Sequence, residues 1–285
     1  MTLKTTNRHE QRTVGSNSVT TLQVPVNGKI HSVMLRFSTG ADADVTEAAI
    51  RAEIGIIRLT VNGKDLVNAS AAKILDLYEV LGRQVSENIG VASVVELNVG
   101  RLVYTDPDAR ELFGLGTADV QSIQIAVTGG TLSTIANVQC FTTRTNEAQK
   151  LGAYMKFINY PVNFNATGDH TMDTLPRDVD SAYLAVLADA GLSGTQTFGE
   201  VRTGNVTLKE RVPASVNKLA VSNDRLATPA GYFVYAFMDT SIFTRLQMAG
   251  INDLRFIQTF SVAPGAAGYN LSALTVVNLD LILKQ

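Results

Sequence analysis

The 285-residue chain is poor in the residues on which many chemical sites depend. It has one cysteine, Cys140, three histidines and no tryptophan. A single thiol excludes an intrachain disulfide and a zinc site built from several thiolates. We therefore expect Cys140 to be a small buried apolar residue. The missing tryptophan weakens the case for a sugar-binding surface, because such surfaces usually present exposed aromatic rings.

Charge and long apolar runs are also scarce. Charged residues make up 18% of the chain, with 24 Lys and Arg against 26 Asp and Glu. This balance argues against a basic nucleic-acid-binding surface, so we predict no direct sequence-specific binding to nucleic acid. No apolar run approaches the ~18–20 residues needed to span a bilayer, and no signal-peptide core is expected at the N-terminus. The apolar fraction of 45% predicts a folded protein with a substantial core.

One pattern occurs twice in the chain. The segment KDLVNASAAKIL, Lys64–Leu75, has an echo in KERVPASVNKLA, Lys209–Ala220. A second, weaker echo relates Leu112–Gln124 to Leu246–Gln258. Both echoes are separated by about half the chain and occur in the same order, which indicates a duplicated domain rather than a short solenoid repeat.

Alternating apolar residues predict short strands in both halves. His31, Val33, Leu35 and Phe37 share one face, so His31 is expected in the core rather than in a catalytic site. Short helices are predicted at four places: after Asp44, from Ile74 to Leu81, from Asp106 to Phe113 and from Ser241 to Met248. The predicted fold is all-β, with two tandem eight-stranded antiparallel jelly rolls (β-sandwiches) and short helices in the loops.

The predicted organisation has three parts: an arm at 1–17, a first roll at 18–146 and a second roll at 147–285. The arm is polar, and Lys4, Arg8 and Arg12 would share one face if it became helical. We expect a disordered tail in the isolated chain. The functional alternative is a basic arm that becomes ordered against lipid headgroups or a neighbouring subunit.

The segments RLTVNGKDL (Arg58–Leu66) and KILDLYEVLG (Lys73–Gly82), in their order after an Asn-Gly turn and a capped short helix, carry a resemblance. The chain resembles the major capsid proteins of tailless icosahedral phages with an internal membrane, the corticovirus type more closely than the tectivirus type. The resemblance implies a homotrimer that forms a pseudo-hexameric capsomer and then a capsid lattice. It also implies contacts with the internal membrane and with minor capsid or vertex proteins, and a place in the virion after assembly in the host cytoplasm.

Candidate chemical sites are few, and we predict neither enzymatic activity nor a cofactor. Asp42 and Asp44 form an Asp-x-Asp pair that could contact a structural calcium ion. Asp169, His170 and Asp173 form the best metal-like cluster, although a solvated loop explains them more simply. Two other functions stay open: a carbohydrate-binding β-sandwich, and a jelly-roll glycosidase whose paired carboxylates lie far apart in sequence.

Overall fold

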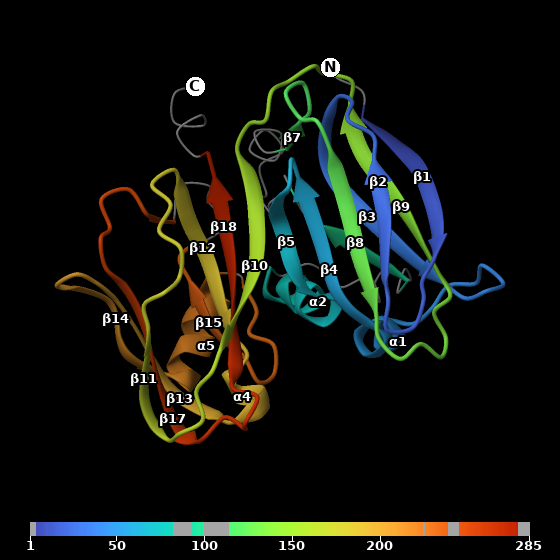
Figure 1. The fold of residues 1–285 in the computed structure, drawn as a ribbon. Coiled ribbons are helices and arrows are strands. Elements are labelled where there is room, and N and C mark those ends of the chain that lie inside the picture. Colours follow the sequence, from blue (N-terminus) through green and yellow to red (C-terminus); the bar gives the residue numbers. More distant parts are fainter. Residues whose placement is uncertain are drawn as a thin grey trace. The chain divides into compact units, whose positions relative to one another are not determined.

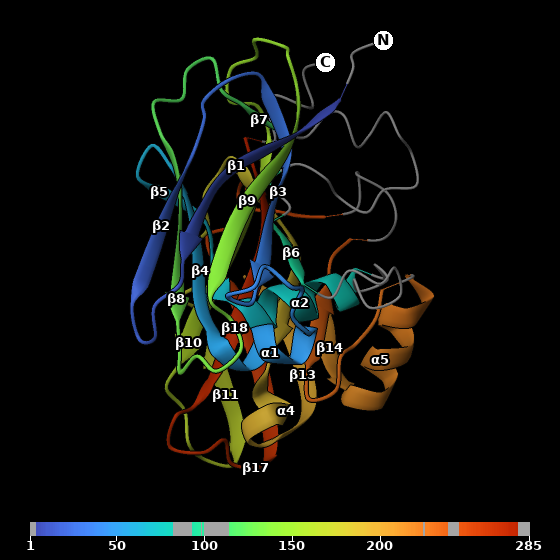
Figure 2. The ribbon, with the colours of Figure 1, turned by 90° about the vertical axis from the view of Figure 1, so that its right-hand side faces the viewer.

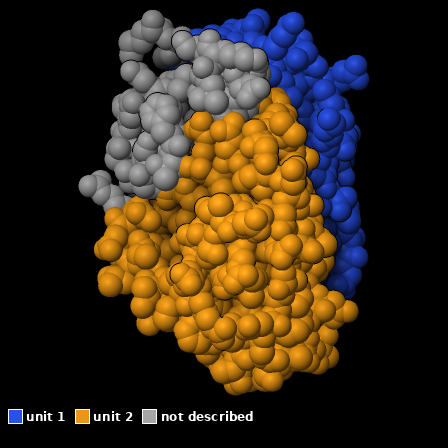
Figure 3. Space-filling model, turned by 90° about the vertical axis from the view of Figure 1, so that its left-hand side faces the viewer, with its two compact units in different colours: residues 1–78, 83–158, 281–285 blue, residues 79–82, 159–280 orange. Residues whose placement is uncertain are grey.

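The computed structural model describes residues 4–81, 93–97, 99, 114–224, 226–238 and 245–278. The chain forms two compact units, coloured separately in Figure 3. The first contains residues 1–78, 83–158 and 281–285, and the second contains residues 79–82 and 159–280. The chain changes unit inside strand β10 (Tyr154–Val162), whereas the sequence analysis places the boundary between residues 146 and 147.

Two antiparallel sheets build the first unit (Figures 1 and 2). One has the strand order β1-β9-β3-β6, with β7 against β3, and the other has the order β2-β8-β4-β5. Helix α1 precedes β4, and α2 follows β5. The bounds are β1 (Thr5–Thr13), β2 (Val19–Val24), β3 (Lys29–Ser38), α1 (Glu47–Glu53), β4 (Ile54–Val61), β5 (Lys64–Ser70), α2 (Ala71–Val80), β6 (Val94–Leu97), β7 (Leu115–Gly116), β8 (Ile123–Gly129) and β9 (Asn137–Thr145).

The core of this unit follows from the period-two patterning of its strands. Val33, Leu35 and Phe37 of β3 are fully buried, and His31 on the same face is 4% exposed. The predicted core position of His31 is therefore confirmed. Cys140 is also fully buried in β9, and burial raises the pKa of its thiol to about 12, as expected for an inert apolar position.

The strands of the second unit are ordered β15-β12-β18-β10 and β11-β17-β13-β14, with β16 against β12. Strand β12 is buried along its whole length. The core of this unit is rich in aromatic rings, including Tyr183, Tyr235 and Phe256. The remaining bounds are β11 (Gly168–Met172), β12 (Ser181–Ala188), α4 (Ala190–Ser193), β13 (Thr195–Thr203), β14 (Val206–Pro213), α5 (Ala214–Asn223), β15 (Phe233–Ala236), β16 (Leu246–Gln247), β17 (Leu254–Val262) and β18 (Tyr269–Val277).

The two units have the same topology. Adding nine to each strand label of the first unit gives the strand order of the second, including the short strands β7 and β16. Each unit folds its chain in half so that early and late strands lie side by side, which is the jelly-roll arrangement. Helices α2 and α5 each follow the fifth long strand. The two copies of the first echo therefore occupy the same topological place, and the predicted double jelly roll is confirmed.

The prediction that the N-terminal arm is disordered is wrong. Thr5–Thr13 form β1, which pairs antiparallel with β9 from Thr5 opposite Arg144 to Thr13 opposite Asn137. Its residues alternate between half-buried and exposed as far as Glu10, so the segment has the patterning of a half-buried strand without large apolar residues. Strand β1 is the first strand of the first roll, and that roll needs it to reach eight long strands.

The predicted short helices have different outcomes. The helix after residue 44 begins at Glu47, and its N-cap is Thr46 rather than Asp44, because the Thr46 hydroxyl accepts a hydrogen bond from the Ala49 N–H. The helix predicted from Ile74 is α2. The helix predicted from Ser241 to Met248 is wrong where the structure describes the segment, because Leu246–Gln247 form β16. The helix predicted from Asp106 to Phe113 lies outside the described residues.

Candidate functional site

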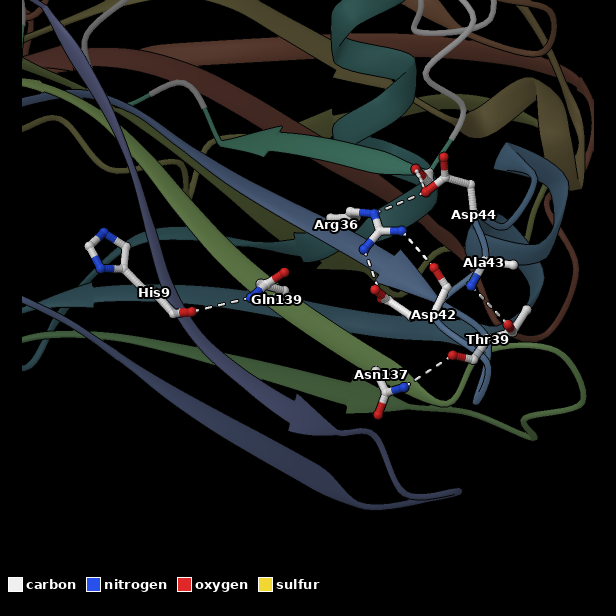
Figure 4. Close-up of polar contacts among 9 residues, drawn as sticks. His9, Arg36, Thr39, Asp42, Ala43, Asp44, Asn137 and Gln139 are labelled. Atoms are coloured by element: carbon white, nitrogen blue, oxygen red, sulfur yellow. Dashed lines mark hydrogen bonds and ion pairs between the residues drawn. The ribbon is translucent and has the colours of Figure 1, made fainter.

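The Asp42–Asp44 pair holds a guanidinium group (Figure 4). Arg36 donates from Nη1 to Asp42 Oδ1 at 2.8 Å and from Nε to Asp44 Oδ1 at 2.9 Å. The hydrogen bond from Arg36, followed by one from Ser93, lowers the pKa of the Asp44 carboxyl. A calcium ion at this place would have to displace the arginine, so the two carboxylates do not fit a cation site. They close the exposed loop after β3 instead.

The second predicted cluster is not brought together. Asp169 and His170 are neighbours in β11, so their side chains point to opposite faces of the sheet. Asp169 accepts a hydrogen bond from Thr259 at 2.5 Å, whereas His170 stacks on the Phe164 ring at 4.3 Å. Burial lowers the pKa of His170. Asp173 is exposed beyond the end of β11.

A polar anchor fixes β1 to the sheet. Arg144, which is 2% exposed, donates from Nη2 to His9 Nε2 at 2.9 Å, and His9 Nε2 lies 2.7 Å from the Thr142 hydroxyl. The ring nitrogen acts as an acceptor towards Arg144, which requires a neutral imidazole. Burial, and then the charge of Arg144, lower the pKa of His9 accordingly. Gln139 adds a hydrogen bond to the carbonyl oxygen of His9 (Figure 4).

The three predicted basic residues lie on or next to β1. Lys4, Arg8 and Arg12 are all exposed, and Arg12 forms an ion pair with Glu10 at 2.5 Å. The pairing register shifts between Arg8 and Gln11, so the strand is irregular there. Because an extra residue reverses the alternation of side chains, the cations do not share the single face that a helical arm would give them.

A buried carboxylate at the end of α1 was not predicted from the sequence. Glu53 is 5% exposed and accepts hydrogen bonds from the backbone N–H groups of Ser133, Thr134 and Ile135, and from the Ser133 hydroxyl at 2.7 Å. Burial alone would raise the pKa of Glu53, but these hydrogen bonds outweigh it and lower the pKa to about 2. A glutamate at a helix end has no sequence signal that separates this role from a solvated one.

An exposed apolar surface on the second roll was also not predicted from the sequence. We call it the β14–α5 surface, and it consists of Val206 and Leu208 on β14 and Val216 and Leu219 on α5. Their exposed fractions are between 42% and 65%. Apolar residues such as these are equally compatible with a buried core, so the sequence does not indicate that they are exposed. Exposed apolar residues of this size on neighbouring elements are typical of a surface that meets protein.

Candidate metal-binding groups and candidate membrane-spanning helices are both absent from the described residues. No group of three or more His, Cys, Asp or Glu side chains there could hold a metal ion. None of the helices within the same ranges is long and apolar enough to cross a membrane.

Two family models match the chain, one in each half. The family model described as viral coat protein P2 N-terminal domain matches residues 8–143, and the model described as viral coat protein P2 C-terminal domain matches residues 154–274. The first match begins inside β1, and the second begins at the first residue of β10. No curated protein sequence matches the chain.

Solved structures show the same fold at low sequence identity. The major capsid protein P2 from bacteriophage PM2 is 13% identical, with a TM-score of 0.82 over 96% of this chain and 97% of that chain. The atomic structure of Sulfolobus Turreted Icosahedral Virus gives 14% identity and a TM-score of 0.71 over 98% and 92% of the chains. The PBCV-1 virus capsid is 10% identical in sequence, with a TM-score of 0.63 over 98% of this chain and 96% of that chain. The two family models together cover most of the chain, which therefore belongs to the viral coat protein P2 family and has a structural role in the capsid of a virion.

Proposed function

We propose that three copies of the chain form a trimeric capsomer, in which six jelly rolls make a pseudo-hexagonal ring, and that these capsomers build the shell of an icosahedral phage with an internal membrane. The observation that carries the proposal is the repeated topology of the two rolls. Two similar rolls in each of three chains supply six similar units, so a ring of six can close from three molecules.

The surface of the chain supports self-association. Charged residues are few, and the β14–α5 surface exposes apolar side chains that gain stability when they are removed from water. A stable contact between copies needs roughly 1,000 Å² or more of buried surface. The four residues of the β14–α5 surface would form part of such a contact.

The two alternatives from the sequence are not favoured. Membership of the coat protein family supports a structural role rather than a carbohydrate-binding or glycosidase function. The lack of enzymatic activity, the lack of a cofactor and the lack of direct sequence-specific binding to nucleic acid stay predictions, as does assembly in the host cytoplasm.

The proposal includes further partners. Lys4, Arg8 and Arg12 are offered as cations that approach an anionic membrane inside the particle, and minor capsid or vertex proteins are expected at the edges of the lattice. Strand β1 changes the form of the membrane proposal, because it presents these residues from a strand rather than from a mobile arm. Each cation near an anionic surface contributes about 1 kcal/mol, so many copies must act together.

Sedimentation velocity tests the trimer directly. The purified chain at micromolar concentration in moderate salt should sediment as a species of about 92 kDa, three times its mass of 30.6 kDa. A chain that remains a monomer of 30.6 kDa up to tens of micromolar would contradict the proposal.

A further inference from the structure

The equivalent strands β5 and β14 differ in what lies beside them. In the first unit, Val67 and Asn68 of β5 pair in parallel with Phe157 and Ile158 at the start of β10. Within the described residues, β14 pairs only with β13 and ends its sheet (Figure 1). The same place in the jelly roll is therefore covered in the first unit, whereas no described strand covers it in the second.

The helices that follow these strands show the same difference. Most apolar residues of α2 are buried, including Ile74, Leu77 and Tyr78. In α5, only Asn217 and Val221 are buried, and Val216 and Leu219 face outward. Among the described elements, nothing covers the β14–α5 surface as its counterpart is covered.

The repeated topology indicates which segment fits the uncovered edge. The strand that covers β5 is β10, the first strand of the second roll, and its counterpart in the first roll is β1. Strand β1 also ends its sheet, with β9 as its one partner among the described strands (Figure 1). We infer that β1 of one copy pairs in parallel with β14 of the next copy, as β10 pairs with β5. The inference rests on the proposed trimer and names the contact that closes it.

Counting along the two rolls gives the register of this contact. Strands β1 and β10 each have nine residues, and each is followed by a five-residue connection, 14–18 or 163–167, to the next strand. Arg8 is therefore equivalent to Phe157. Helices α2 and α5 begin at Ala71 and Ala214, which makes Val67 equivalent to Glu210.

The equivalent of the Phe157–Val67 pair is thus Arg8 beside Glu210, a pair of opposite charges. Arg8 would then serve the contact between copies, which leaves Lys4 and Arg12 as the cations for the membrane. Both side chains are exposed in the single chain. An ion pair placed in a contact between copies mainly selects the partner and sets the register, while the exposed apolar residues nearby supply burial.

A bulge in β14 does not oppose this pairing. Edge strands often carry bulges that prevent further pairing. The register of β14 against β13 shifts twice, between Thr207 and Lys209 and between Lys209 and Val212, whereas the register of β5 against β4 shifts once, between Asp65 and Val67. Strand β5 nevertheless pairs with β10 at Val67. The two strands share one shift, between Thr207 and Lys209 in β14, which therefore belongs to the common fold, whereas the second shift, which spans Glu210, occurs in β14 and not in β5.

Charge reversal tests the contact. Arg8→Glu and Glu210→Arg should each raise the concentration at which half of the chain is trimeric by about tenfold or more, measured by sedimentation. The double variant should return this midpoint to within about threefold of the original. The matched control is Arg12→Glu, a reversal on the same strand beyond the register shift, which should leave the midpoint within about threefold. Circular dichroism confirms that each variant is folded.

A covalent test does not depend on stability. Neighbouring strands are about 5 Å apart, a separation at which Cα atoms can be joined by a disulfide. Oxidised Arg8→Cys/Glu210→Cys protein should give linked dimers and trimers on a non-reducing gel and no larger ladder, because a closed ring of three has no free end. Arg12→Cys/Glu210→Cys is the matched control and should remain unlinked.

The outcomes separate the two proposals. An unaltered chain that never self-associates contradicts the proposed function. A chain that forms trimers while both single reversals assemble like the original, and while the cysteine pair at positions 8 and 210 fails to link, contradicts only the contact between β1 and β14.

Discussion

Glu53 gives the sharpest prediction at the scale of single residues. Glu53→Gln removes the charge that accepts three backbone N–H groups and a hydroxyl, so we expect a loss of roughly 2–3 kcal/mol in the free energy of unfolding at pH 7. Urea unfolding measures it. Glu79→Gln, which changes an exposed carboxyl on α2, is the control and should cost well under ~1 kcal/mol.

The same substitution has a defined pH dependence. The pKa of Glu53 falls from 4.5 to about 2 in the folded chain, so its contribution is complete above pH 4.5 and is lost as the pH decreases towards 2. The difference in stability between the original chain and Glu53→Gln should therefore shrink over this range. A difference that is constant from pH 6 to pH 3 would show that the carboxylate is not stabilised as described.

Some single-residue roles could be predicted from sequence and others could not. The alternation around His31 placed it in the core because burial follows the strand period. Asp44 has the spacing of a helix cap, but Arg36 binds its carboxylate and Thr46 caps the helix. Both aspartate and threonine are good N-caps, so local spacing alone did not decide between them. The competing partner is eight residues away on another element.

At the scale of elements, β1 is the main test. Deuterium exchange followed by mass spectrometry should show protection of the β1 amides that pair with β9, comparable with the amides of β3, since both strands flank β9. A disordered tail would exchange at the rate of an unfolded peptide. Exchange of the β1 segment within seconds at neutral pH, with β3 protected, would contradict its place in the sheet.

The repeat in the sequence identified the right elements in the wrong register. Matching letters pair Ala71 with Val216, whereas the two helices begin at Ala71 and Ala214, a difference of two residues. The buried positions give the correct alignment, because Ile74 and Asn217 are both the fourth residue of their helices. Identical letters fall partly on exposed positions, where substitutions are tolerated, so burial is the more reliable guide to equivalence.

The second echo also identifies the right elements in the wrong register. It pairs Leu112 with Leu246, but the two-residue strands begin at Leu115 and Leu246, so the correct offset differs by three residues. The order of elements was predictable because patterning repeats on the scale of whole strands. Exact register was not, because it is decided by pairing between strands that are distant in the sequence.

At the scale of the whole molecule, the membrane proposal has its own test. Intact chain should float with anionic liposomes at low salt and less at high salt, whereas a Lys4→Gln/Arg12→Gln variant should float less at low salt. Both residues lie outside the charge pair proposed for assembly, so trimer formation should be unchanged in sedimentation. Equal flotation of both proteins at either salt concentration would exclude these cations as the membrane contact. Deleting residues 1 to 17 would be a poor test, because it removes β1 from the sheet.

The duplicated roll also has a consequence for the kinetics of assembly. A ring of six separate rolls would need five successive association steps, each losing the translational and rotational freedom of one molecule, a cost of about 4–15 kcal/mol per step. Joining the rolls in pairs through the continuous strand β10 leaves two such steps. Ring closure then depends on the cube of the chain concentration instead of its sixth power. A shell built from this chain should therefore start to form at a lower protein concentration, and over a narrower interval of time, than one built from single rolls with the same contacts.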